Sequence, residues 1–305
     1  MCAALLTTLF WSASAVCAAR SARLLGPVEA NFWRLLLSVT LLAVWALTFG
    51  RGLFGPGLAL FIISGLIGVG IGDTAFFQSL PRLGTRLTLL LVTCLTPPFG
   101  ALIEWLWLGT WLSALQIVCG LLALAGVAAA LVPARHLDLP RGVALVGVVF
   151  SALAALGGAV GAVLSRKGYA AVQAAGGHLD GGTAAFERLL GGFGIAALGL
   201  ALARRREIPA ALGGNGAPAH AALAKWKGVW MWVAANGLFG QTLGVSAYQW
   251  ALEQLPTGVV LSVVSLTPLT VIPMARVVEG ERPSRHSLVG TVVAVGGVVG
   301  LVLGS

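Results

Sequence analysis

The sequence predicts an all-α integral membrane protein of ten transmembrane helices arranged as two inverted five-helix repeats. The first observation is composition: 58% of the 305 residues are hydrophobic and only 10% are charged, whereas soluble domains carry roughly 25% charged residues. The second is that apolar windows of about 20 residues, long enough to span a bilayer, recur along the whole chain. The third is an internal repeat, because residues 65–132 and 237–303 follow the same plan.

The first repeat contains five apolar windows, at 3–19, 29–49, 58–80, 86–108 and 112–132. The first window lacks the basic start of a signal peptide, so we expect it to remain as a helix. The third carries glycines spaced from Gly65, and these favour close helix packing over a phosphate-binding loop because no strand precedes them. The fourth contains Pro97 and Pro98, which we expect to break the helix and to act as a hinge or ligand contact.

The second repeat has matching windows at 142–164, 183–203, 228–250, 257–277 and 286–303. A second glycine-spaced stretch begins at Gly237, and Pro268 is expected to break the ninth helix as the paired prolines break the fourth. We place the repeats at 1–135 and 141–305, joined by a polar linker at 136–140. An odd number of helices in each repeat puts the two repeats in opposite orientations in the membrane.

The net charge of +9 is distributed as in a membrane protein, because the basic residues gather at helix ends and in loops. The loops after the first, third, fifth, seventh and ninth windows hold nearly all of the Lys and Arg, whereas the opposite loops hold only Arg51, Arg166 and Lys167. The positive-inside rule therefore predicts both termini outside, in a bacterial-type inner membrane. The same distribution speaks against a nucleic-acid partner.

Short motifs give the chain a family resemblance. It resembles the drug/metabolite transporter superfamily, in particular the ten-helix type with two EamA-like repeats. The resemblance implies secondary transport and a central cavity between helices 3, 4, 8 and 9. The chain departs from the family at Gly109-Thr110, where Gly-Glu is usual, and in the predicted position of its termini, which the family often places in the cytoplasm. The motifs are Phe10-Trp11-Ser12, Phe32-Trp33-Arg34-Leu35-Leu36, Phe186-Glu187-Arg188-Leu189-Leu190, Thr96-Pro97, Thr267-Pro268 and Gly280-Glu281.

Charged side chains inside apolar windows are costly and therefore mark candidate functional sites. Asp73 is deepest, and it is either a proton-carrying cavity residue or a structural hydrogen-bond acceptor. Glu104 is the second coupling candidate, facing the cavity mouth or paired with an arginine. Arg34 and Arg188 occupy matching positions in the two repeats, where each either snorkels or caps a helix end, or binds a substrate carboxylate.

Aromatic and amide side chains suggest a cavity for a mostly apolar zwitterion or a flat metabolite. Phe76-Phe77-Gln78 and Tyr248-Gln249-Trp250 stand in equivalent registers of the two repeats. An interfacial aromatic belt is the alternative for some of these rings. The candidate substrate-binding residues are Trp11, Asp73, Phe77, Gln78, Thr93, Gln241, Tyr248 and Ser265.

The sequence thus predicts a secondary transporter that exports small organic metabolites, with aromatic or apolar amino acids as the leading class, by alternating access between inverted repeats. Proton-coupled efflux of lipophilic cations is one alternative, although the first helix lacks the acidic residue on which small multidrug proteins depend. A non-transporting membrane scaffold is the other. We expect no enzymatic activity, no cofactor and no metal. The expected partners are a small-molecule substrate and the lipid bilayer, and the expected state is a monomer or weak homodimer.

Overall fold

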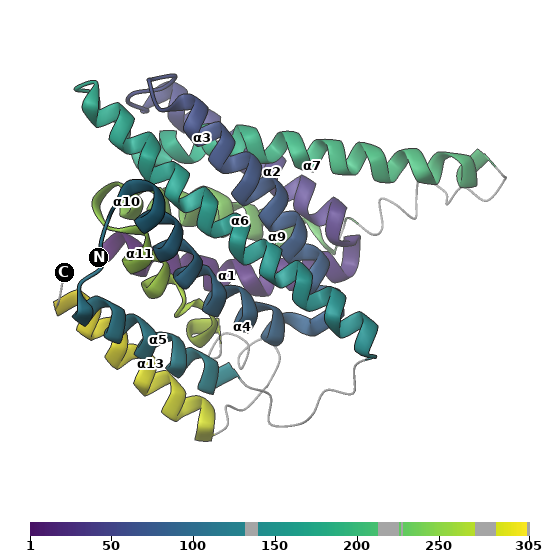
Figure 1. Cartoon of the computed structure of the whole chain (residues 1–305). Coiled ribbons are helices and arrows are strands. Elements are labelled where there is room, and N and C mark those ends of the chain that lie inside the picture. The colour runs from purple at the N-terminus through teal and green to yellow at the C-terminus, as the bar shows by residue number, and fades with distance from the viewer. Residues whose placement is uncertain (132–139, 213–225, 227, 272–284, 304–305) are drawn as a thin grey trace.

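The computed structural model describes residues 1–131, 140–212, 226, 228–271 and 285–303, and within these ranges the chain is built from ten helices (Figure 1). Some of these helices consist of several segments, because a π-helical stretch or a kink divides them. The segments are α1 (Cys2–Leu25), α2 (Pro27–Thr48), α3 (Leu58–Gly65), η1 (Leu66–Gly72), α4 (Asp73–Leu108), α5 (Ala114–Leu131), α6 (Arg141–Ala174), α7 (Gly181–Leu212), α9 (Trp230–Asn236), η2 (Gly237–Gly244), α10 (Val245–Gln254), α11 (Thr257–Val264) and α13 (Arg285–Leu303).

The helices have the length and composition of membrane spans. Six of those described are long and apolar enough to cross a bilayer, and three shorter apolar helices, among them α5, accompany them. Helices α6 and α7 are longer than the sequence windows predicted, ending at Ala174 and Leu212 rather than near 164 and 203. Helical backbone continues there past the apolar stretch, and α7 projects from the bundle at its C-terminal end (Figure 1).

The helices of the two halves pack in a reciprocal pattern. Helix α1 packs against α9, η2 and α10, and α6 packs in the same way against α3, η1 and α4. The second helices of the halves, α2 and α7, pack against each other, as do the last ones, α5 and α13. The start of α1 and the end of α13 lie at the same end of the molecule (Figure 1). Exchanging the halves therefore leaves the set of helix contacts largely unchanged.

The two glycine-spaced stretches form π-helices rather than ordinary α-helix. They are η1 and η2, and they occupy equivalent places in the two halves. A π-helix bonds each N–H to the carbonyl five residues back and is frequently found at functional sites. Ser38 on α2 donates to the carbonyl of Gly237 at 2.9 Å, so a neighbouring side chain serves the altered backbone of η2.

Gly84 separates the third helix from the fourth. Its φ of 75° is the single non-helical interruption within α4, and it is a conformation that glycine adopts readily. Ser79 before the kink and Thr88 after it share a hydrogen bond of 3.0 Å, and Ser79 also bonds to Ser151 on α6 at 2.7 Å. These hydroxyls fix the angle between the two segments against α6.

The paired prolines and Pro268 behave differently. Helix α4 runs through Pro97 and Pro98 with helical backbone angles, so the expected break does not occur there although two backbone donors are missing. Before Pro268 the helix is interrupted by a turn at residues 265–266. Pro268 cannot donate to the carbonyl of Val264, and the hydroxyl of Thr267 bonds to that carbonyl at 2.6 Å instead.

Small residues let α5 and α13 approach backbone to backbone. A Cβ atom built on Gly297 would lie 2.5 Å from the amide nitrogen of Ala123, and one built on Gly126 would lie 2.3 Å from the amide nitrogen of Ala294. The adjacent Gly296 faces open space. Glycine at this contact is therefore a packing requirement, as is common between membrane helices.

Asp180 caps the start of α7 and ties it to the end of α2. Its carboxylate accepts hydrogen bonds from the backbone N–H of Thr183 at 3.0 Å, the backbone N–H of Arg51 at 2.8 Å and the indole of Trp45 at 3.0 Å. Burial alone would raise the pKa of Asp180, but the hydrogen bond from the hydroxyl of Thr183, at 2.5 Å, and the three bonds named above outweigh it and hold the pKa below the ordinary value of 3.8. The Gly280-Glu281 motif and residues 136–139 of the predicted linker lie outside the described residues.

Candidate functional site

A cavity of about 200 Å³ lies between the two halves of the bundle. Its walls come from α1, α2, α4, η2 and the broken helix that begins with α11. Apolar and aromatic side chains dominate, with one acidic and one basic group among them. The lining residues are Trp11, Ser14, Ala15, Ala18, Arg34, Asp73, Phe76, Phe77, Leu89, Val92, Thr93, Thr96, Gly240, Gln241, Leu261, Val264, Ser265 and Thr267.

An ion pair between Arg34 and Asp73 is the charged centre of this cavity. The Nη2 atom of Arg34 lies 2.6 Å from Oδ2 of Asp73, and the Arg34 side chain is 6% exposed while that of Asp73 is 27% exposed. Arg34 also donates through Nε and Nη2 to Oδ1 of Asn31, at 3.0 and 2.8 Å. Its guanidinium lies 4.7 Å above the ring of Phe77. Arg34 is thus held on three sides, and Asp73 keeps part of its carboxylate open to the cavity.

Both π-helices contribute to this centre. Asp73 is the first residue after η1, and Gln241 lies within η2. The amide of Gln241 donates to Oδ2 of Asp73 at 2.9 Å, so the same oxygen accepts from both halves of the chain. Movement of one half relative to the other would break or reshape this shared contact.

Trp11 and Tyr248 form an aromatic pair at the cavity wall. The indole N–H of Trp11 donates to the carbonyl of Gly240 in η2 at 3.0 Å, and its ring centroid lies 5.1 Å from that of Tyr248. Tyr248 is only 2% exposed, and behind it the guanidinium of Arg188 lies 5.5 Å from its ring. Trp11 therefore contacts the cavity, while Tyr248 and Arg188 form successive layers behind it.

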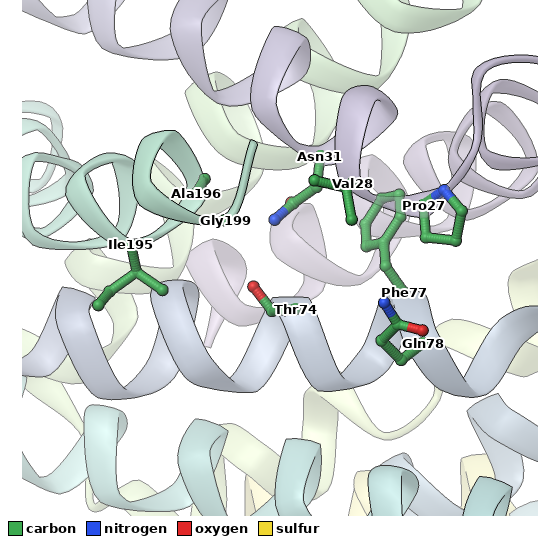
Figure 2. A pocket seen from close by; sticks show the side chains of 9 residues that line it. All are labelled: Pro27, Val28, Asn31, Thr74, Phe77, Gln78, Ile195, Ala196 and Gly199. Atoms are coloured by element: carbon green, nitrogen blue, oxygen red, sulfur yellow. The ribbon is translucent and has the colours of Figure 1, made fainter. Parts of the chain in front are cut away.

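The predicted binding residues divide between three places. Trp11, Asp73, Phe77, Thr93, Gln241 and Ser265 line the cavity together. Tyr248 does not line it but supports Trp11 from behind. Gln78 lies in a second, smaller hollow of about 90 Å³ between α2, α4 and α7, with Asn31 and Thr74 (Figure 2).

The other predicted residues lie at different positions. Glu104 does not line the cavity, and it forms an ion pair with Arg166 at 2.8 Å. Its carboxylate also accepts a hydrogen bond of 2.7 Å from the backbone N–H of Thr257 and thereby caps the start of α11. Of the prolines, neither Pro97 nor Pro98 lines the cavity, although Thr96 beside them does. Pro268 follows the lining residue Thr267.

Sequence reasoning did not single out Asn31, Ser14 or Gly240. Asn31 orients Arg34, and its only sequence signal is its place one helical turn before that arginine. Ser14 bonds to Asn236 at 2.7 Å beside η2. Gly240 contributes a backbone carbonyl, which a reading based on side chains does not detect.

Comparison with known proteins decides the family. A model described as the EamA-like transporter family matches residues 1–132 and 145–303. The chain belongs to the EamA-like transporter family. A crystal structure of a protein matches with a TM-score of 0.70 at 16% sequence identity, covering 99% of this chain and 96% of the other. At that identity the likeness shows the fold alone, and a search of curated proteins finds no match. This EamA-like transporter is therefore a multi-pass membrane protein and not an enzyme.

Proposed function

We propose that this EamA-like transporter exports small zwitterionic metabolites, with amino acids as the leading class, by alternating access. The observation that carries the proposal is the Arg34–Asp73 pair at the cavity wall. A zwitterion presents an ammonium and a carboxylate close together, which Asp73 and Arg34 complement respectively. Guanidinium matches carboxylate geometry well, so Arg34 suits the second contact. The aromatic wall of Trp11, Phe76 and Phe77 suits an apolar side chain.

The cavity size supports a small substrate. Its volume of about 200 Å³ lies below the range of roughly 300–1,000 Å³ found for sites that enclose drug-sized ligands. The charge arrangement also disfavours lipophilic cations, because Asp73 already accepts from Arg34 and Gln241. A cation would have to displace a guanidinium held by Asn31 as well. A scaffold without transport gives no reason for an ion pair facing an internal cavity.

Coupling to protons is proposed through Asp73. Protonation of its carboxylate would weaken the pair with Arg34 and compete with the substrate ammonium, so that a proton and a substrate molecule bind to Asp73 alternately. Glu104 is less suited to this role, because Arg166 and the start of α11 occupy its oxygens. Facilitated diffusion through the same cavity requires no such step, so flux measured with and without a pH gradient separates the two.

We further propose that the two repeats, 1–135 and 141–305 with the linker 136–140, rock about this cavity. The η1 and η2 segments and the interrupted helix at 265–266 would absorb the movement. The excess of Lys and Arg in one set of loops supports an inner-membrane orientation with both termini outside. The test is a reporter that works only in the cytoplasm, fused to Ser305. Activity of this reporter would contradict the proposed orientation.

Flux into proteoliposomes tests the function. Labelled aliphatic and aromatic amino acids are offered to wild-type protein and to Asp73→Asn and Trp11→Ala variants, with Arg204→Gln as a control remote from the cavity. We expect saturable flux of one group, lost in the two cavity variants and retained in the control. Flux of lipophilic cations without amino-acid flux would overturn the proposal in favour of drug efflux, and the absence of both would reject transport of these classes.

A further inference from the structure

Arg188 on α7 is a buried charge without a protein partner. It is 5% exposed, and its Nε atom is buried without a hydrogen-bond acceptor. In the described part of the chain it forms no ion pair within contact distance and no hydrogen bond. Its guanidinium lies 5.5 Å from the ring of Tyr248 and interacts with the carboxylate of Asp73 only electrostatically. Guanidinium remains protonated in proteins. An isolated buried charge is strongly unfavourable unless another charge compensates it.

The other half of the molecule shows what is missing. Arg34 and Arg188 stand at matching positions, but Arg34 has Asp73 as its partner. Asp73 follows η1 directly, and the residue that follows η2 in the same way is Val245. Val245 is 2% exposed and belongs to the same buried cluster as Phe186 and Leu189, which lie two residues before and one residue after Arg188. The second half thus keeps the arginine and lacks the acid.

Nearby carboxylates are already engaged elsewhere. Asp73 accepts from Arg34, and Glu187 accepts the backbone N–H of Phe54 at 2.8 Å. A second unpartnered donor lies in the same region, because the hydroxyl of Tyr169 on α6 is buried without a hydrogen-bond partner. Tyr169 belongs to the same buried cluster as Ala184, which is one helical turn before Arg188 on α7. Two buried donors without acceptors describe a site that is complementary to a negative charge.

We infer that Arg188 and Tyr169 form a second binding site, separate from the central cavity, that takes a small monovalent anion. The anion is a carboxylate or an inorganic ion such as chloride, since both present one negative charge to these donors. Its identification with a substrate carboxylate rests on the proposed transport function, but the anion site itself does not. Tyr248 and Trp11 stand between Arg188 and the cavity, so displacement of this aromatic pair would connect the two.

Two glycines leave the space that the guanidinium of Arg188 occupies. A Cβ atom on Gly68 in η1 would lie 2.6 Å from Nη2 of Arg188, and one on Gly161 in α6 would lie 3.0 Å from it. The guanidinium therefore fits between backbone segments from both halves of the chain. An anion bound there would contact the junction between α6, α7 and η1, which move relative to one another in the proposed mechanism.

The test adds the missing acid to the second half. Val245→Asp places a carboxylate where Asp73 stands in the first half, and Val245→Asn is its uncharged control of nearly the same shape. Arg188→Gln removes the charge, and Tyr169→Phe removes only the hydroxyl. Thermal unfolding of each full-length purified protein is followed in detergent at matched ionic strength in sodium acetate, sodium chloride and sodium sulfate. Sulfate is the reference, because a double charge costs more to bury.

Sulfate also stabilises folded proteins in general, so the response of each protein is compared with that of Arg188→Gln and Val245→Asp, in which the site is absent. Exchange of sulfate for acetate or chloride should raise the unfolding midpoint of the wild type and of Val245→Asn by about 2 °C or more relative to the change in these two variants. This additional rise should be smaller in Tyr169→Phe. A response to acetate alone identifies a carboxylate site, and a response to chloride as well identifies an inorganic one. If the wild type shows no response, or if all variants respond equally, the inference is wrong.

Two features keep the test decisive. If Arg188→Gln does not fold, Val245→Asp still removes the site while it retains the arginine. The midpoint of Val245→Asp should lie above that of Val245→Asn, because only the carboxylate compensates Arg188. No flux is measured, so failure of the transport proposal and failure of this inference are separate results.

Discussion

The Arg34–Asp73 pair gives a quantitative prediction about the centre of the molecule. Asp73→Asn keeps the shape of the side chain but removes the countercharge of Arg34, which is 6% exposed. Removing one member of a buried ion pair costs about 3–5 kcal/mol. We expect about 3 kcal/mol, the lower end of this range, because Asp73 is 27% exposed and Arg34 keeps its two hydrogen bonds to Asn31.

A double-mutant cycle separates the pair from its surroundings. For a chain of this size, a loss of about 3 kcal/mol corresponds to a decrease of about 6 °C in the unfolding midpoint. Arg34→Gln should have a similar effect, because it leaves Asp73 with Gln241 as its remaining donor. The double variant should be much less destabilised than the sum of the single ones, because neither charge is then left alone.

The exposed pair of Arg204 and Glu29 is the control. Their charged atoms are 3.8 Å apart, and the side chains are 58% and 34% exposed. Arg204→Gln should change the midpoint little, because exposed ion pairs contribute less than about 1 kcal/mol. Additive losses in the Arg34 and Asp73 cycle, or a control as damaging as Asp73→Asn, would refute the reasoning.

Three further predictions concern packing, pH and capping. Gly297→Ala should destabilise the α5–α13 contact by about 1–3 kcal/mol through overpacking, whereas Gly296→Ala should be neutral or stabilising, as unfolding midpoints will show. The pKa of Asp180 is lowered on folding, so its stabilising contribution is complete above pH 3.8 and is lost as pH falls through the lower folded pKa. Thermal unfolding across this acid range should therefore show a smaller pH dependence in Asp180→Asn. Glu104→Gln should lower the free energy of unfolding by about 1–3 kcal/mol without changing the pH dependence of flux, because its carboxylate serves Arg166 and the start of α11; an altered flux profile would restore it as a coupling residue.

The sequence predicted the helices well because hydrophobic windows depend on composition over about 20 residues. Their ends were less predictable, since helical hydrogen bonding continues beyond the apolar stretch in α6 and α7. The effect of proline was only partly predictable. The same Thr-Pro pattern occurs within continuous helix at Pro97, whereas at Pro268 the helix is interrupted by a turn at residues 265–266. The surrounding contacts therefore decide the outcome.

The sequence predicted many residues of the candidate site, but it did not predict which of them contact one another. Asp73 and Arg34 both stood out as charges in apolar windows, but hydropathy carries no information on which charges meet. Their pairing depends on the approach of α2 to the start of α4, which is tertiary packing. Tyr248 was expected at the cavity and lies one layer behind it, because its ring packs against that of Trp11 at an interplanar angle of 41°. Gln241 donates across the halves, which spacing along one helix could not reveal.

The π-helical segments change the direction in which the residues after them face. A bond that spans five residues instead of four holds one extra residue in the turn. In an α-helix one residue corresponds to a rotation of about 100°. A helical wheel drawn through residues 58–84 without this offset therefore places Asp73 on the wrong side of its own helix. Rewinding η1 as α-helix would turn everything after it by the same angle and carry the carboxylate away from Arg34. Each half thus contains such a rotation: η1 immediately precedes the cavity residue Asp73, and η2 itself contains Gly240 and Gln241.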